Sequence, residues 1–225
     1  MTVFVVAEPV SQQESLPSTV APSSILSRLR LETRREHEAV EQVLDLMGVS
    51  LTVQRYRHRL EQFYGFYAPL EQRLQARELT LPSNMRAALA ARLNKTALLR
   101  QDLKYLGTRP DTLPLCCNLP PLGTQAEVLG CVYVMEGATL GGRMISQHIR
   151  TALGITPTTG GSFFEGYGGE TGMMWQSMRH LLVNGASDIE AENTIVTNAA
   201  TTFASLRCWC ESFQKQTHIG TTHYV

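Results

Sequence analysis

Helical periodicity is the feature that most constrains this chain, and it runs from Ser24 almost to the C-terminus. Apolar residues recur at steps of three and four over long segments, whereas the alternation typical of β-strands is almost absent. A proline-containing stretch over 108–123 and a glycine-rich stretch over 154–169 are predicted to connect helices. The predicted helical segments are 24–47, 52–78, 83–106, 124–153, 170–183 and 188–215. We therefore predict an all-α fold of roughly six to eight helices.

Length and charge limit the organisation of the chain and its partners. With 225 residues and 43% hydrophobic content, the chain is long enough for one core, and nothing requires a second domain. We predict a helical domain over 23–216, a mobile N-terminal tail over 1–22 and a C-terminal tail over 217–225. Lysine plus arginine equals aspartate plus glutamate at 20 each, so no general field attracts nucleic acid or an anionic membrane. Any anionic ligand must be held by a few placed cations.

The cysteines and the N-terminus indicate a cytoplasmic protein. The five cysteines show neither zinc spacing nor a disulfide framework, which is typical of a reducing compartment. The short apolar run near the N-terminus has no basic residue before it and is interrupted by Glu8 and Pro9, so we do not expect a signal peptide. No apolar stretch approaches the roughly 20 residues that span a bilayer. We therefore expect no membrane partner.

A histidine lies on an apolar helix face in the segment LRLETRREHEAVE. His37 falls in line with Leu29, Thr33 and Val40. Taken alone, such a histidine is more often a core residue whose nitrogens are satisfied. However, Glu41 lies one turn later, where it could accept a proton from one ring nitrogen and leave the other free to bind a metal.

Two arginines flank this histidine. Arg30 and Arg34 lie two turns and one turn before His37 on nearly the same side, so cations accompany whatever His37 contacts. A solvated helix face is the commoner explanation for each arginine taken separately.

The segment 124–153 carries glycines in its interior. Each one costs about 1 kcal/mol of helix stability relative to alanine. Close packing against a neighbouring helix and a flat ligand pressed against the backbone would both explain them, and the sequence alone leaves both open. Tyr133 and Phe203 could line a pocket, although aromatic residues at helical spacing usually belong to the core. The glycines are Gly130, Gly137, Gly141 and Gly142.

Several kinds of site are not indicated. No GK[ST] follows the glycine-rich stretch, and the chain has no nucleophile elbow. It has no pair of Glu-x-x-His motifs of the di-iron type, and no flavin or nicotinamide fingerprint. Any electrons for a redox reaction must therefore come from outside the chain.

Taken together, several motifs in order resemble the heme oxygenase family, in particular its bacterial branch associated with bacteriophytochromes. The resemblance covers about residues 25–213. It rests on LRLETRREHEAVE, FYGFYAPLE, YVMEGATLGG, FFEGYGG and ENTIVTNAATTF.

The resemblance implies a helical fold that holds heme between a proximal and a distal helix. His37 matches the iron ligand, and Glu41 matches the acidic residue that orients it. Arg30 and Arg34 fall where the family places cations near the heme propionates.

The resemblance also implies a distal wall. Gly137 and Gly141 match the distal glycines beside the iron-bound oxygen. Further heme contacts are expected from Thr33, Tyr133 and Phe203. One departure is Ala138, which stands where animal members carry an aspartate that organises water.

The implied reaction is oxidative opening of heme to biliverdin, iron and carbon monoxide. Heme would be both substrate and cofactor, O2 the oxidant, and an external ferredoxin or reductase the electron donor. A bacteriophytochrome is one candidate acceptor of biliverdin. One alternative is a heme carrier or sensor without turnover, which Ala138 keeps open. Another is a relative of the same helical superfold that acts on a different cyclic cofactor and does not need His37.

Overall fold

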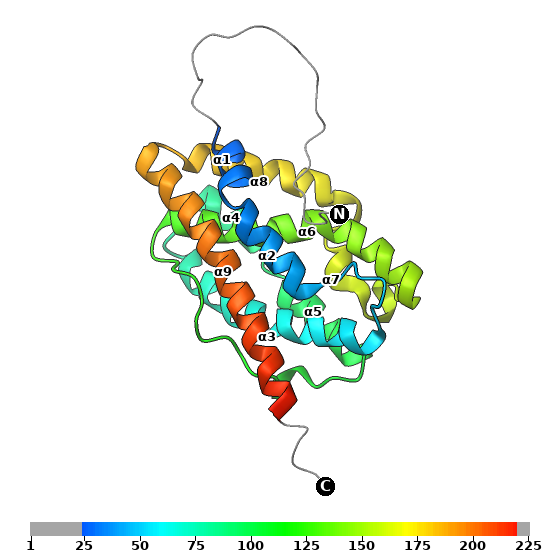
Figure 1. Cartoon of the computed structure of the whole chain (residues 1–225). Coiled ribbons are helices and arrows are strands. Elements are labelled where there is room, and N and C mark those ends of the chain that lie inside the picture. The colour runs from blue at the N-terminus through cyan, green and yellow to red at the C-terminus, as the bar shows by residue number, and fades with distance from the viewer. Residues whose placement is uncertain (1–23, 220–225) are drawn as a thin grey trace, which may run out of the picture.

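The computed structural model describes residues 24–219, and within that range it contains helices and loops but no strand (Figure 1). The predicted all-α fold is therefore confirmed. The predicted N-terminal tail lies outside the described residues, whereas α9 continues to Ile219, past the predicted end of the domain. The α-helices are α1 (Ile25–Glu32), α2 (Arg34–Leu44), α3 (Val53–Glu78), α4 (Ser83–Ala90), α5 (Lys95–Tyr105), α6 (Gln125–Leu153), α7 (Ser162–Glu165), α8 (Thr171–Gly185) and α9 (Ile189–Ile219). Three shorter turns of helix are η1 (Pro110–Thr112), η2 (Pro157–Gly161) and η3 (Gly168–Glu170).

Local sequence signals explain where α6 begins and ends. The Thr124 hydroxyl accepts a hydrogen bond from the Glu127 amide, and the Glu127 carboxylate accepts one from the Thr124 amide, which forms a capping box. Gly154 ends the helix in the left-handed region, with φ of 69°. The predicted segment 124–153 therefore corresponds closely to the helix.

The predicted helix 24–47 is divided. The Thr33 side chain donates a hydrogen bond to the Leu29 carbonyl oxygen at 2.6 Å, and the chain passes from α1 to α2 at Thr33. Back-bonding of this kind bends helices. α2 ends at Leu44, before the predicted end, because Asp45 adopts a left-handed conformation with φ of 44°.

The predicted helix 83–106 is also divided, at residues 91–94. The carboxylate of Glu71 on α3 accepts hydrogen bonds from the backbone amides of Lys95 and Thr96, at 2.7 and 3.0 Å. A distant carboxylate therefore caps the N-terminus of α5 and stabilises a new helix start there.

Long-range packing places α1 and α2 beside the middle of α6. α2 lies along α9, and α6 packs against both α8 and α9 (Figure 1). α3 packs against α5, and its Phe63 and Tyr67 join a cluster of aromatic rings with Phe163 and Phe164. The core thus holds α1–α2 and α6 as two walls, with α3 and α9 closing the space between them.

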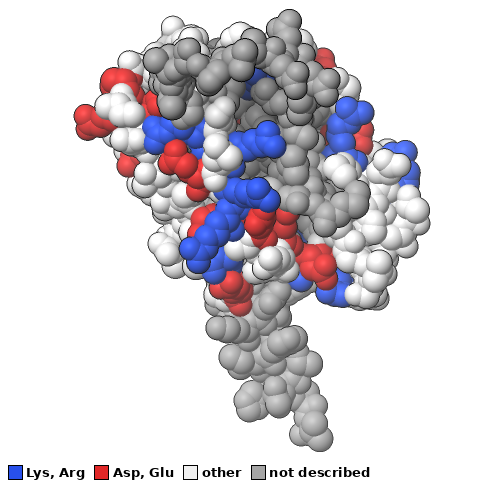
Figure 2. All heavy atoms as spheres, turned by 45° about the horizontal axis from the view of Figure 1, so that its top comes forward, with Lys and Arg blue, Asp and Glu red and all other residues white. Residues whose placement is uncertain are grey.

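The surface carries both signs of charge. On the face shown in Figure 2, basic and acidic side chains lie next to one another, in line with equal numbers of each in the sequence. Within the described residues, no helix combines the length and the apolar character needed to span a bilayer.

Candidate functional site

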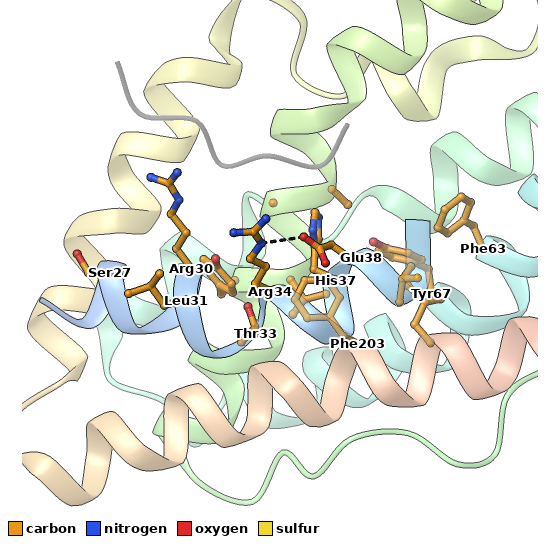
Figure 3. A pocket seen from close by; sticks show the side chains of 16 residues that line it. Ser27, Arg30, Leu31, Thr33, Arg34, His37, Glu38, Phe63, Tyr67 and Phe203 are labelled. Atoms are coloured by element: carbon orange, nitrogen blue, oxygen red, sulfur yellow. Dashed lines mark hydrogen bonds and ion pairs between the residues drawn. The ribbon is translucent and has the colours of Figure 1, made fainter. Parts of the chain in front are cut away.

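A cavity of ≈ 360 Å³ lies between α1–α2, α3, α6 and α9 (Figure 3). Its size is in the range of small-molecule sites, about 300–1,000 Å³. Most of the lining is apolar, and the polar groups come mainly from α1 and α2. The lining residues are Ser27, Arg30, Leu31, Thr33, Arg34, His37, Glu38, Val40, Phe63, Tyr67, Tyr133, Val134, Gly137, Ala138, Phe203 and Leu206.

His37 lies in the α2 wall of the cavity (Figure 3). The ring of Phe203 on α9 packs against it edge to face, with centroids 5.3 Å apart, and this contact restricts the imidazole plane. Burial lowers the pKa of His37, while the charges of Glu41 and Glu38 oppose that shift. The imidazole is therefore predominantly neutral near pH 7, the form that binds metals. Glu41 itself is not among the lining residues.

Two arginines extend from the same side of α1 and α2 as His37 (Figure 3). Arg34 Nε lies 2.7 Å from Glu38 Oε1, and this pair is largely exposed. Arg30 makes no ion pair with another described residue. The cavity mouth thus carries two cations, one of which already has a carboxylate partner.

The glycines of α6 divide into two kinds. Gly137 lines the cavity, and a Cβ added there would meet nothing within 4 Å. A Cβ at Gly142 would lie 2.6 Å from the Phe164 carbonyl oxygen, and one at Gly130 would collide with the Ile195 carbonyl oxygen. Gly141 is buried in α6 but does not line the cavity. Helix packing thus explains Gly130 and Gly142, whereas Gly137 leaves space for a ligand.

Tyr133 and Thr33 close the cavity on the side of α1. Burial raises the pKa of Tyr133 to about 12, although a hydrogen bond with Thr33 and the charge of Arg30 oppose the shift. The Tyr133 ring also packs on Trp175 of α8, with centroids 6.0 Å apart. Burial therefore keeps the phenol neutral, and the contacts with Thr33 and Trp175 restrict the ring beside the cavity.

Sequence reasoning missed three polar residues of the cavity, which are Ser27, Glu38 and Tyr67. Tyr67 is 2% exposed, lines the cavity, and its hydroxyl makes no hydrogen bond to another described residue. Glu38 also lines the cavity. Tyr67 had the same signal as His37, a polar group on an apolar helix face, but tyrosine is common in cores. Glu38 sits in a run of charges and gave no distinct signal.

The side chains of the cavity that could bind a metal suit a ligand that already contains a metal ion. Among the described residues, no group of three or more His, Cys, Asp or Glu side chains could hold a metal ion. A single neutral histidine beside a glycine-lined space fits an iron porphyrin, because the ring supplies four nitrogen ligands and the protein needs to supply only an axial one. The space above Gly137 and the cations at the mouth suit a flat, anionic ligand.

Comparisons with known proteins agree with this fit. The family model described as heme oxygenase matches residues 23–212. A heme oxygenase structure from Neisseria meningitidis, solved with bound NO and CO, is similar with a TM-score of 0.69 and 20% identity, over 84% of this chain and 92% of that one. The heme oxygenase of Leptospira interrogans gives a TM-score of 0.68 and 20% identity, over 84% of this chain and 99% of that one. No curated protein matches the chain.

The two solved structures show the same helical fold, and the family match extends over most of the chain. The matched range includes every residue that lines the cavity. This chain therefore belongs to the heme oxygenase family and is an enzyme that degrades heme.

Proposed function

We propose that heme binds in the cavity between α1–α2 and α6, with His37 as the axial ligand of the iron. One observation carries the proposal. The wall that holds the neutral imidazole of His37 shares a cavity with Gly137, where the absence of a side chain leaves open space. Phe203 restricts the ring from α9. Glu41, whose charge acts on His37, orients the imidazole so that one nitrogen remains available.

Arg30 and Arg34 hold the propionates of heme and so fix its rotation in the plane. Arg30 has no carboxylate partner among the described residues and is the more available of the two. Arg34 pairs with Glu38 in a largely exposed contact, and such pairs contribute little free energy, so its guanidinium can exchange partners. Guanidinium groups suit carboxylates because they bind two oxygens at once.

The reaction opens heme to biliverdin with release of iron and carbon monoxide, and bound heme supplies the iron on which O2 is activated. Gly137 leaves open space beside the bound heme, and Gly141, which lies one turn later, is buried in α6. Thr33 and Tyr133 limit the space for the heme ring on the side of α1. Because Ala138 provides no acid, the Tyr67 hydroxyl, which makes no hydrogen bond to another described residue, is a polar group of the cavity wall that can hold a water molecule. Positioning of heme is thus the chain's main contribution.

Electrons come from an external ferredoxin or reductase, and a bacteriophytochrome is a candidate acceptor of biliverdin. The absence of a flavin or nicotinamide fingerprint in the sequence supports an external donor. We place the enzyme in the cytoplasm. Its described cysteines are all free, and Cys117 and Cys208 are exposed, which suits a reducing compartment.

A hemin titration tests the proposed ligand. Addition of one equivalent of hemin to the wild-type protein should produce a Soret band, and a reductant in air should convert it to the spectrum of biliverdin. The His37→Ala variant should lose the ligated spectrum and the conversion. His180→Ala, which changes an exposed histidine on α8, is the matched control and should behave as wild type.

Two results would contradict the proposal. An unchanged ligated spectrum in His37→Ala would exclude His37 as the ligand. A wild-type Soret band that persists under reductant and air would favour the carrier or sensor alternative.

A further inference from the structure

A buried cluster of charges lies directly behind Gly137. The side chains of Arg92 and Glu136 are both 2% exposed, and Arg92 Nε lies 3.3 Å from Glu136 Oε2. Lys95 Nζ, equally buried, lies 3.4 Å from Glu136 Oε1. Tyr167 donates a hydrogen bond to Glu136 Oε1 at 2.8 Å and accepts one from Lys95 Nζ at 3.1 Å. Three polar side chains thus meet at Glu136, the residue that precedes Gly137.

The cluster continues to the opposite wall of the cavity. Lys95 is also the first residue of α5, and its backbone amide donates to Glu71 on α3 at 2.7 Å. Glu71 lies one turn after Tyr67, which lines the cavity. The Lys95–Glu136 ion pair and the hydrogen bond from the Lys95 amide to Glu71 therefore link the Gly137 wall to the α3 helix that carries Tyr67.

The charges and the burial of these side chains indicate that this network fixes the geometry of the fold and does not only stabilise it. Its two carboxylates, Glu71 and Glu136, balance two cations, Arg92 and Lys95. Buried ion pairs of this kind often stabilise a protein no more than apolar residues of the same volume would, because desolvation offsets the attraction. Burial lowers the pKa of Lys95, and the Glu136 carboxylate opposes that shift. What such a network provides is one defined geometry, since each member loses its partners if another moves.

We propose that Glu136 and Tyr167 are positioning residues for heme opening. Through the buried network they fix the Gly137 backbone of α6 relative to Tyr67 across the cavity. Tyr167 is held by a loop between Gly166 and Gly168, which both have positive φ, at 57° and 56°. Arg92 also donates to the Met174 carbonyl oxygen at 2.9 Å, which ties α8 to the same point. The inference rests on the proposed binding of heme between His37 and Gly137.

Tyr167→Phe is the first test, because it removes the hydroxyl and keeps the ring. In the heme-free protein, amide hydrogen exchange of α6 around Gly137 should accelerate about tenfold, since a hydrogen bond to a buried charge is lost. At saturating heme, the rate of biliverdin formation should fall several-fold while the Kd for heme stays within about threefold. A role in stability alone would raise exchange throughout the chain and leave the rate per folded molecule unchanged.

Tyr64→Phe is the matched control. It removes another buried tyrosine hydroxyl, which accepts a hydrogen bond from Arg100 at 2.8 Å and does not line the cavity. Both measurements should remain at wild-type values. Equal effects in the two variants, or unchanged α6 exchange in Tyr167→Phe, would overturn the proposal.

A charge-balanced variant provides a second test if Tyr167→Phe does not fold. The double variant Glu136→Gln with Lys95→Met removes one charge of each sign, and it should show the same local increase in α6 exchange. Exchange is measured without heme, so its outcome is independent of the proposed ligand. Failure of the wild-type protein to ligate heme through His37 would instead count against the proposed function.

Discussion

Gly137 and Gly142 both lie on α6, but they lack side chains for different physical reasons. Gly142 allows the Phe164 backbone to approach α6, whereas Gly137 faces open cavity. The sequence pattern contained both explanations and could not assign them, because the assignment depends on what lies opposite each residue. The structure distinguishes a packing glycine from a site glycine.

Replacement of Gly137 by Ala should therefore separate stability from function. The heme-free variant should be as stable as wild type or more stable by up to about 1 kcal/mol, since alanine favours the helix and its Cβ meets no atom. Heme opening should slow, because the methyl group occupies the space beside the proposed iron position. Urea unfolding and the rate of biliverdin formation measure the two effects.

Gly142→Ala is the control for that variant. Its Cβ would lie 2.6 Å from the Phe164 carbonyl oxygen, so it should destabilise the heme-free protein by about 1–3 kcal/mol. Loss of stability in Gly137→Ala as large as in Gly142→Ala would show that Gly137 is also a packing residue.

Site residues could be predicted where local pattern and chemistry coincide. His37, Arg30 and Arg34 fall at helical spacing in the sequence, and they still point to the same side although the chain bends between α1 and α2. The buried network could not be predicted in this way. Arg92, Lys95 and Glu136 look like ordinary surface charges in the sequence, and their partners lie far along the chain. Burial of a charge is decided by tertiary contacts that no local pattern contains.

At the scale of elements, helix type was predictable but helix division was not. The apolar periodicity of 83–106 continues through the break between α4 and α5, because the interruption is imposed by Glu71 from α3. Similarly, Thr33 fits the apolar stripe and yet bends the chain through its hydroxyl. The break at Thr33 is accompanied by one side-chain hydrogen bond, and the start of α5 is fixed by two hydrogen bonds to Glu71.

The contact between α3 and the loop after α5 should depend on pH. Burial raises the pKa of Glu61, but hydrogen bonds from His58 and Thr108 outweigh it, so the pKa lies below its ordinary value. A lowered pKa stabilises the fold above the unfolded-state pKa, and this contribution is lost as pH falls through the folded-state value. Thr108→Val should thus cost about 1.5 kcal/mol at pH 7 and less at pH 3.

Urea unfolding at the two pH values measures this difference. Thr112→Val is the control, because its hydroxyl donates to the Arg109 carbonyl oxygen, which does not titrate. Its cost should be the same at both pH values. An equal cost of Thr108→Val at pH 7 and pH 3 would show that the Glu61 charge plays no part.

The arginines of α1 and α2 should affect heme orientation. Arg30→Ala or Arg34→Ala should weaken heme binding by about two- to fivefold or change the ratio of biliverdin isomers, as expected for exposed charge pairs. Glu38→Gln should strengthen binding, because it releases Arg34 from its carboxylate partner. Hemin titration and isomer analysis provide the measurements.

Arg35→Ala serves as the control for these variants, since Arg35 is a neighbouring exposed arginine that does not line the cavity. It should leave affinity and isomer ratio unchanged. Wild-type values of both quantities in Arg30→Ala and Arg34→Ala would remove the arginines from the proposed site.

For the molecule as a whole, heme should stabilise the fold by mass action. At free heme 100 times its Kd, the gain is about 2.7 kcal/mol, and it should be visible as a higher Tm. Hydrogen exchange should show the largest added protection in α1 and α2, which line much of the cavity yet bury only Ile25, Leu29, Val40 and Leu44. Protection confined to α6 would contradict this expectation.

The bend at Thr33 has a consequence for how a bulky ligand enters and its product leaves. α6 packs against α7, α8 and α9 over most of its length and forms the rigid side of the cavity. The opposite side consists of two helices rather than one, because the Thr33 hydroxyl donates a hydrogen bond to the Leu29 carbonyl oxygen at the point where α1 meets α2. We expect heme to enter and biliverdin to leave by a rotation of α1 about Thr33 that breaks the contacts of Arg28 with α9, while α2 keeps His37 packed against Phe203.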